Sequence, residues 1–364
     1  MKNRLKRIGV VIALILLILV GAGFWSEIHE TRLTSRTSQP GLETIRPDWQ
    51  GTPVDQNGRF MNDEFPMVMR PSRLLQWQLS RNPFAEEKAN DTWRPNVADP
   101  TEFLASNRDG LIWLGHASVY IRLNGVTILT DPIFGAPSLV ERYVDLPSPL
   151  DKISKLDYVL LSHDHRDHMD EPTLREIAQR FPNTKFLAGM RSEELIRGFV
   201  TPTNDIRTAG WFQRYDLGAS PVEIYFLPVR HWSRRGLFDT NERLWGGFVI
   251  KNDQTSIYFG GDSGYGRHYR ETGDAFPEID YFLIGIGAYE PRWFMEPNHN
   301  NPADAVRAST DSGARTLIPI HYGTFNLSDE PPSAPLRELT KEAEQAKISE
   351  QIRVLDLNGY VHFE

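Results

Sequence analysis

The chain has 364 residues, of which 40% are hydrophobic and 11% aromatic, which is enough apolar material for one large core or two modest ones. Its formal net charge of −8 argues against a general nucleic-acid binder, because such proteins usually present a basic surface. The absence of cysteine excludes disulfides and thiolate metal sites, so a metal would have to be bound by histidine and carboxylate side chains.

The first 25 residues have the pattern of a membrane segment. Four basic residues between positions 2 and 7 precede an uncharged run over residues 8–25, which is near the lower length for crossing a bilayer. We expect an uncleaved transmembrane anchor over residues 1–25, with a cleavable signal peptide as the alternative because residues 21–23 are small. The positive flank then predicts that the catalytic part lies on the extracytoplasmic side, periplasmic or extracellular.

Residues 26–100 are polar and punctuated by prolines, which predicts a tether followed by an extension that wraps the catalytic body. Aromatic residues are frequent in this region, whereas disordered tethers are usually poor in them. They are Trp49, Phe60, Phe65, Trp77, Phe84 and Trp93. We therefore expect part of the extension to dock onto the domain or onto lipid.

Residues 101–364 have the pattern of a catalytic domain that alternates strands and helices. Apolar runs predict strands over residues 111–114, 119–123 and 126–130, and Asn124-Gly125 predicts a type I′ hairpin between the last two. A second hairpin is expected around residues 252–254. Helices are expected over residues 172–181, 302–312 and 333–347. This order predicts two mixed sheets packed face to face, with helices outside.

Three histidines, two aspartates and one arginine make up the hexapeptide 163–168, which follows the apolar run 158–161. In an extended segment side chains two residues apart point the same way, so His163 and His165 can reach one ion. A helical turn after them would direct Asp167 and His168 toward a second position. Imidazole and carboxylate at this density are typical of a zinc site, while a charged solvated loop is the alternative.

Three further donors follow short apolar runs that we expect to be core strands. His231 comes after residues 222–229, Asp262 after 256–259, and His321 after 316–320. Strand ends that converge on one rim hold ligands rigidly, so these side chains and the hexapeptide are predicted to meet. The glycines before Asp262 allow close approach of the backbone, and Asp262 is placed to bridge two ions.

These residues resemble the metallo-β-lactamase superfamily, whose signature His-x-His-x-Asp-His is matched by His163, His165, Asp167 and His168. The stretches 113–118, 130–134, 261–265, 291–295 and 320–325 resemble its N-acylphosphatidylethanolamine-hydrolysing phospholipase D branch. The resemblance extends from about residue 59 to the end of the chain. It implies an α/β fold, a four-layer αβ/βα sandwich, here preceded by the N-terminal membrane segment.

The resemblance also implies the cofactor and the reaction. Two zinc ions are expected, one held by His163, His165, His231 and Asp262, the other by Asp167, His168, Asp262 and His321. A hydroxide bridging the two ions would attack the phosphorus of a phospholipid diester. The implied products are phosphatidic acid and the head-group alcohol or amide.

Other residues are assigned less directly. Asp131 and His116 are expected to orient ligating imidazoles, although His116 is equally compatible with a structural role. His299 is placed with Asp262 as catalytic, since the resembling branch carries a histidine here, and a surface loop residue is the alternative. His29, His268 and His362 are expected to be ordinary surface residues.

The segment 289–295 is expected to bind substrate or, alternatively, to be a packed loop. In the first interpretation Tyr289, Trp293, Phe294 and Met295 line an acyl groove, and Arg292 meets a phosphate. Arg166 stands where the resemblance would place an aromatic residue, which leaves the head-group preference open.

The sequence is compatible with three functions. The first is a membrane-tethered dizinc phosphodiesterase of phospholipids, and the second is a dizinc hydrolase of lactones or other carboxylic esters. The third is a binding module on an inactive hydrolase scaffold, which retention of all seven donors argues against. The expected partners are the lipid or ester substrate and the membrane, and no nucleic acid.

Overall fold

The computed structural model describes residues 32–62, 64–66, 71–137, 140–146 and 149–363. The anchor expected over residues 1–25 lies outside these ranges, as does His29. Within the described ranges, none of the helices combines the length and the apolar character that crossing a membrane requires.

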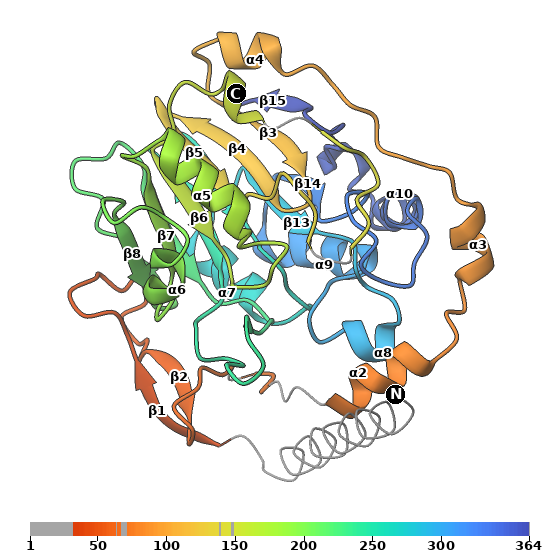
Figure 1. The fold of residues 1–364 in the computed structure, drawn as a ribbon, viewed down its shortest axis with the longest axis horizontal. Coiled ribbons are helices and arrows are strands. Elements are labelled where there is room, and N and C mark those ends of the chain that lie inside the picture. Colours follow the sequence, from red (N-terminus) through yellow and green to blue (C-terminus); the bar gives the residue numbers. More distant parts are fainter. Residues whose placement is uncertain (1–31, 63, 67–70, 138–139, 147–148, 364) are drawn as a thin grey trace, which may run out of the picture.

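Two mixed β-sheets form the centre of the molecule (Figure 1). The first has seven strands in the order β15-β3-β4-β5-β6-β7-β8: β3 Gly110–Gly115, β4 Ser118–Leu123, β5 Val126–Thr130, β6 Tyr158–Leu161, β7 Lys185–Gly189, β8 Ile206–Ala209 and β15 Tyr360–His362. The second has six strands in the order β14-β13-β12-β11-β10-β9: β9 Gln213–Arg214, β10 Glu223–Leu227, β11 Gly247–Lys251, β12 Ser256–Phe259, β13 Tyr281–Gly285 and β14 Thr316–Ile320. Strands β5 to β8 run parallel, as do β12 to β14.

Alternation along the strands of the first sheet separates two apolar cores. Val119 and Ile121 of β4 belong to the core shared with the second sheet, whereas Tyr120 between them faces a core on the other side. That outer core is closed by Leu174 and Ile177 of α5 (Glu171–Arg180), which lies over this sheet in Figure 1. The sheets thus pack face to face, as the sequence predicted.

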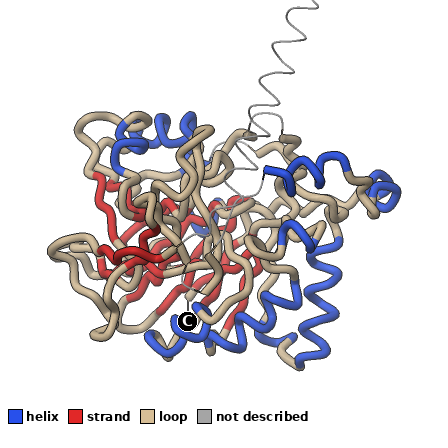
Figure 2. The backbone as a smooth tube through the Cα atoms, turned by 90° about the horizontal axis from the view of Figure 1, so that it is seen from below, coloured by secondary structure: helices blue, strands red, loops and turns tan. Residues whose placement is uncertain are grey.

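The remaining helices flank the sheets, and Figure 2 shows strands inside and helices along the periphery. Among them are α6 Glu193–Arg197, α7 His268–Ala275, α9 Pro302–Ser312 and α10 Ala334–Ala346, with two 3₁₀ turns at Pro149–Lys152 and Ser349–Gln351. Helix α9 begins with a capping box of Asn301 and Asp304 and ends at Gly313, whose φ of 67° closes the helix. These signals are local, and they explain why the expected bounds of α9 agree with the observed ones.

Both expected hairpins are confirmed. Asn124 and Gly125 have φ angles of 49° and 74°, as a type I′ turn requires, and Leu123 pairs with Val126. The second hairpin joins β11 to β12, with Lys251 opposite Ser256.

Part of the segment 32–100 lies against the catalytic body through its aromatic side chains. It contains β1 Leu33–Thr37, β2 Thr52–Asp55, α2 Pro71–Leu79 and α3 Ala85–Asn90, and α4 Thr101–Ala105 follows it. The Trp49 ring lies 4.8 Å from that of Phe212, and the Trp77 ring stacks at 5.1 Å on Phe294 of α8 (Arg292–Met295). Helix α2 thereby lies beside α8, as Figure 1 shows.

Candidate metal centre and active site

The loops that follow β6, β10, β12 and β14 bring together all seven side chains that the sequence predicted as metal donors. Because β6 belongs to one parallel set and β12 and β14 to the other, their carboxyl ends lie at one edge of each sheet. The site therefore lies between the two sheets at this edge.

Three imidazoles form the first group. The Nδ1 atom of His165 lies 2.8 Å from Nε2 of His163 and 3.2 Å from Nε2 of His231. Oδ2 of Asp262 lies 4.0 Å and 3.9 Å from the Nε2 atoms of His163 and His231. Three ring nitrogens at such distances cannot all hydrogen-bond to one another, since each offers either one proton or one lone pair.

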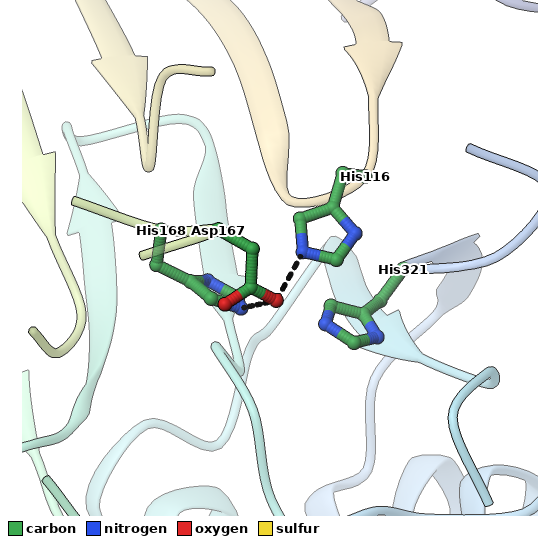
Figure 3. A group of neighbouring side chains, drawn as sticks. All are labelled: His116, Asp167, His168 and His321. Atoms are coloured by element: carbon green, nitrogen blue, oxygen red, sulfur yellow. Dashed lines mark hydrogen bonds and ion pairs between the residues drawn. The ribbon is translucent and has the colours of Figure 1, made fainter. Parts of the chain in front are cut away.

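The second group contains Asp167, His168 and His321, shown with His116 in Figure 3. Oδ2 of Asp167 lies 3.5 Å from Nε2 of His168. Asp262 reaches this group too, because Oδ2 lies 3.1 Å from Nε2 of His168 and Oδ1 lies 3.1 Å from Nε2 of His321. Asp262 is thus in contact with both groups, as its predicted bridging position requires.

Backbone geometry explains how these residues approach so closely. After His165 the chain turns, since its carbonyl accepts from the backbone N–H groups of His168 and Met169. Gly261 precedes Asp262 with a φ of 55°, and a Cβ there would lie 3.1 Å from Cβ of Ser162 and 3.2 Å from the carbonyl of Gly246. Glycine is therefore required where the β12 loop passes the hexapeptide.

The donor set fits divalent metal ions. Nε2 of His168 and Nε2 of His321, which both face Asp262, are buried and make no hydrogen bond of suitable geometry within the described part of the chain. Buried polar atoms are rarely left in this state unless an ion or another ligand satisfies them. Imidazole nitrogens combined with carboxylate oxygens suit zinc and similar borderline cations.

On three of the histidines, the ring nitrogen that faces away from the centre is held by a neighbouring group. Nδ1 of His163 lies 2.8 Å from Oγ of Ser162, and Nδ1 of His231 lies 3.1 Å from the carbonyl of Asn298. Nδ1 of His168 lies 2.8 Å from Oδ2 of Asp131, which also accepts from Oγ of Ser162 at 2.5 Å. Each partner directs the other nitrogen, Nε2, toward the centre.

Burial and neighbouring charges set the protonation states of the apoprotein. Burial lowers the pKa of His231 to about 3 and that of His165 to about 4, which leaves these imidazoles neutral at neutral pH. Burial alone would lower the pKa of His168, but the carboxylates of Asp262, Asp167 and Asp131 raise it well above its ordinary value. Burial would likewise raise the pKa of Asp262, but His168 and His321 hold it well below its ordinary value. The carboxylates thus favour a positive charge at their centre.

His116 and His299 both lie beside the donors. Nε2 of His116 is 3.1 Å from Oδ2 of Asp167, and the ring centroids of His116 and His321 are 4.0 Å apart. His299 places Nδ1 3.8 Å from Oδ2 of Asp262, and its side chain is 17% exposed. The position of His299 is thus not that of a surface loop residue.

A cavity of about 810 Å³ opens over the centre. Its apolar lining comes partly from α2 and α8, through Leu74, Trp77, Phe294 and Met295. Its polar lining includes His165, Asp167, His231, Asp262, His299 and His321, together with Arg73, Arg166, Arg230, Arg234 and Arg235. The cavity therefore combines the metal donors with apolar and cationic surfaces.

The segment 289–295 contributes less to this cavity than the sequence suggested. Phe294 and Met295 line it, whereas Tyr289 is buried elsewhere and Trp293 is 39% exposed. Arg292 is committed to other partners: it donates to the carbonyl of His299 at 3.0 Å and to Asp304 at 2.7 Å. Arg292 is therefore not positioned to contact a substrate phosphate, as the sequence had suggested it would be.

Sequence reasoning missed several residues around the site. Ser162, Asn298, Arg234 and Arg235 carry no motif, and their roles depend on segments that meet only in the fold. The expectation for His268 was wrong: its side chain is buried, with Nε2 3.0 Å from Oγ of Ser263, because α7 packs against α9.

Comparison with known proteins agrees with this architecture. The Beta-lactamase superfamily domain matches residues 126–322. The chain belongs to this superfamily. N-acyl-phosphatidylethanolamine-hydrolyzing phospholipase D 1 of Caenorhabditis elegans is 33% identical over 65% of this chain and 70% of its own. The mitochondrial N-acyl-phosphatidylethanolamine-hydrolyzing phospholipase D of Saccharomyces cerevisiae is 32% identical over 64% of this chain and 51% of its own.

Solved structures share the fold. Igni18, a metallo hydrolase from the archaeon Ignicoccus hospitalis, aligns with a TM-score of 0.53 at 22% identity, over 70% of this chain and 98% of its own. This likeness concerns the fold alone. The superfamily domain begins at residue 126, so α2 and its share of the cavity lie outside the part of the chain that it matches.

Proposed function

We propose that this metal-dependent hydrolase cleaves phosphodiester bonds of phospholipids with the aid of two zinc ions. The observation that carries the proposal is the convergence of seven imidazole and carboxylate side chains, two of them with unsatisfied buried nitrogens that face Asp262, on a cavity that also has an apolar wall. The names of the similar proteins from Caenorhabditis elegans and Saccharomyces cerevisiae support a phospholipid substrate.

His163, His165 and His231 would hold one ion, Asp167, His168 and His321 the other, and Asp262 both. When bound, such ions would lower the pKa of water, supply a hydroxide at neutral pH and offset charge on the phosphate oxygens. Asp262 lies between the two groups, because its Oδ2 atom is 3.1 Å from Nε2 of His168 and 4.0 Å and 3.9 Å from Nε2 of His163 and His231. His299 lines the cavity within 3.8 Å of Asp262, where a ring nitrogen can hydrogen-bond to a phosphate or leaving-group oxygen.

The apolar wall accounts for the lipid part of the substrate. Trp77 and Phe294 stack at a centroid distance of 5.1 Å and both line the cavity, so acyl chains can lie along them without exposing apolar surface to water. The arginines of the lining favour an anionic phosphodiester over a neutral lactone, which is the alternative substrate. With the anchor over residues 1–25, the cavity would act on lipids at the extracytoplasmic face of a membrane.

Mass spectrometry of a total lipid extract incubated with the protein and zinc tests the function. The expected result is release of phosphatidic acid together with N-acylethanolamines, and Asp262→Asn serves as the inactive control. An unchanged lipid profile alongside hydrolysis of lactones would instead establish the carboxylic-ester alternative.

A further inference from the structure

Three arginines of the cavity, from the hexapeptide and the loop after β10, have no carboxylate within ion-pair distance among the residues that the structure describes. These are Arg166, Arg234 and Arg235, and Arg73 of α2 is a fourth cavity arginine of this kind. Arg230 differs, since it lies 3.3 Å from Glu296 and its guanidinium packs 3.6 Å from the ring centroid of Phe65. The guanidinium groups of Arg166, Arg234 and Arg235 are thus not held in ion pairs, although Asp164, Asp170 and Glu171 act on the charge of Arg235 from farther away.

Their positions are fixed close to the centre. Arg166 lies in the hexapeptide between His165 and Asp167. The guanidinium of Arg234 lies 5.3 Å from the ring centroid of Trp232, which in turn lies 4.5 Å from that of His165. Arg235 donates to the carbonyl of Met169 at 2.7 Å. All three arginines therefore line the same cavity as His165 and His231 of the first histidine group.

The loop that carries Arg234 and Arg235 is held by internal hydrogen bonds. Asp239 accepts from the backbone N–H groups of Arg235 at 3.3 Å and of Gly236 at 2.8 Å. Arg243 pairs with Asp239 and also with the buried Asp164 of the hexapeptide, where its Nε lies 2.5 Å from Oδ2. The fold thus links this loop to the metal-binding hexapeptide and sets where its cations lie.

Holding like charges together costs free energy unless an anion binds between them. Burial, and after it the guanidinium of Arg166, lower the pKa of Arg235, and together they outweigh Asp164, Glu171 and Asp170, which raise it. A phosphodiester carries one negative charge, and in the proposed function that charge lies at the metal centre. Guanidinium groups bind carboxylates and phosphates through paired hydrogen bonds.

We propose, on the basis of the phosphodiesterase function above, that Arg166, Arg234 and Arg235 recognise a second anionic group, a carboxylate or a phosphate, on the head group of the substrate. The apolar wall at α2 and α8 receives the diacylglycerol part of the same molecule. The preferred substrates are then phospholipids with at least two negative charges.

Matched substrate pairs test this preference. N-acylphosphatidylserine differs from N-acylphosphatidylethanolamine by one carboxylate, and phosphatidylglycerophosphate differs from phosphatidylglycerol by one phosphate. Each would be presented at low mole fraction in uncharged detergent micelles, so that surface charge stays constant. We expect kcat/KM to be at least about tenfold higher for the more charged member of one pair or both, as hydrogen bonds to charged groups imply. The pair that shows the preference identifies the anion.

The double variant Arg166→Gln, Arg234→Gln should lower the ratio of the two kcat/KM values, that of the more charged substrate over that of the less charged one, by at least about tenfold. Arg315→Gln combined with Arg337→Gln is the matched control, because it removes two exposed cations that are paired with Asp280 and Glu87 outside the cavity. Equal kcat/KM within both pairs, or an equal loss of ratio in the control, would overturn the inference while the phosphodiesterase function stood.

Calorimetric binding of soluble head groups to the metal-free protein separates the two proposals. The probes are N-acetylglycerophosphoserine and N-acetylglycerophosphoethanolamine. We expect the former to bind at least about tenfold more tightly, and only to protein with Arg166 and Arg234 intact. If no lipid is hydrolysed but this difference is found, the phosphodiesterase function fails and the anion site stands. If both probes bind equally, the anion site is refuted whatever the activity.

Discussion

Replacing Asp131 by Asn should weaken metal binding without unfolding the protein. Asp131 is fully buried, and its Oδ2 lies 2.8 Å from Nδ1 of His168, while Oδ1 accepts from the backbone N–H of Ser162 at 2.7 Å. Asparagine has the same shape and keeps the Oδ1 bond, but it places an NH₂ group where Oδ2 was. Nδ1 of His168 must then accept, so its proton moves to Nε2, the nitrogen that faces the centre.

The size of this effect follows from the role of Asp131 as the group that orients a ligating histidine. A protonated Nε2 cannot bind a metal ion, and loss of a group that orients a ligating histidine lowers metal affinity by about 10- to 100-fold. That factor corresponds to about 1.4 to 2.7 kcal/mol of binding free energy. In the apoprotein, where neighbouring carboxylates raise the pKa of His168, Nε2 already carries a proton that faces Oδ2 of Asp262 at 3.1 Å, and this contact remains in the variant. The variant should therefore lose more metal affinity than apoprotein stability.

Competition with a chromogenic zinc chelator measures the affinity, and denaturant unfolding of the apoprotein measures stability. Asp157→Asn is the control, because Asp157 also accepts from a backbone N–H and a hydroxyl, those of Thr127, but holds no histidine. An affinity within twofold of the unaltered protein, or an equal loss in the control, would refute the role given to Asp131.

Three further changes follow from the same contacts. His268 is buried with its pKa lowered to about 3, first by burial and then by Arg230, so its contribution to stability is present above pH 6.5 and is lost as the pH falls toward 3. His268→Gln should remove about 2 kcal/mol of the stability difference between neutral pH and about pH 5, and an unaltered pH dependence on denaturant titration would contradict this. Asp262→Asn should lower both the zinc affinity and the turnover by more than the roughly 100-fold that loss of an orienting group costs. Plasma mass spectrometry of the bound zinc and a lipid assay would show these losses, and two bound ions with normal turnover would exclude the bridging position of Asp262. Trp77→Ala should lower kcat/KM about tenfold for a long-chain phospholipid but not for a small soluble phosphodiester, because it removes apolar cavity surface; equal losses on both would point to damage at the centre instead.

Much of the metal centre was predictable because its signals are local. His163, Asp262 and His321 each follow a short apolar run, and such runs become buried strands whose ends meet at one edge. Turn residues such as Asn124 and capping residues such as Asn301 likewise act within a few positions, so hairpins and helix bounds agreed with the structure.

The cavity walls were not predictable in the same way. Arg292 and Trp293 stand in a motif-like segment, yet a nearby acid, Asp304, takes the arginine, and the tryptophan faces solvent. Arg234 gains its meaning only because the loop after β10 folds onto the hexapeptide. Leu74 reaches the cavity from a helix far away in the sequence. Such contacts depend on tertiary packing, which periodicity and composition do not specify.

Anomalous diffraction at the zinc edge, from crystals of the protein grown with zinc, tests the central claim most directly. Two peaks are predicted, one among His163, His165 and His231, the other among Asp167, His168 and His321, both in contact with Asp262. A single peak, or peaks away from these residues, would contradict the account.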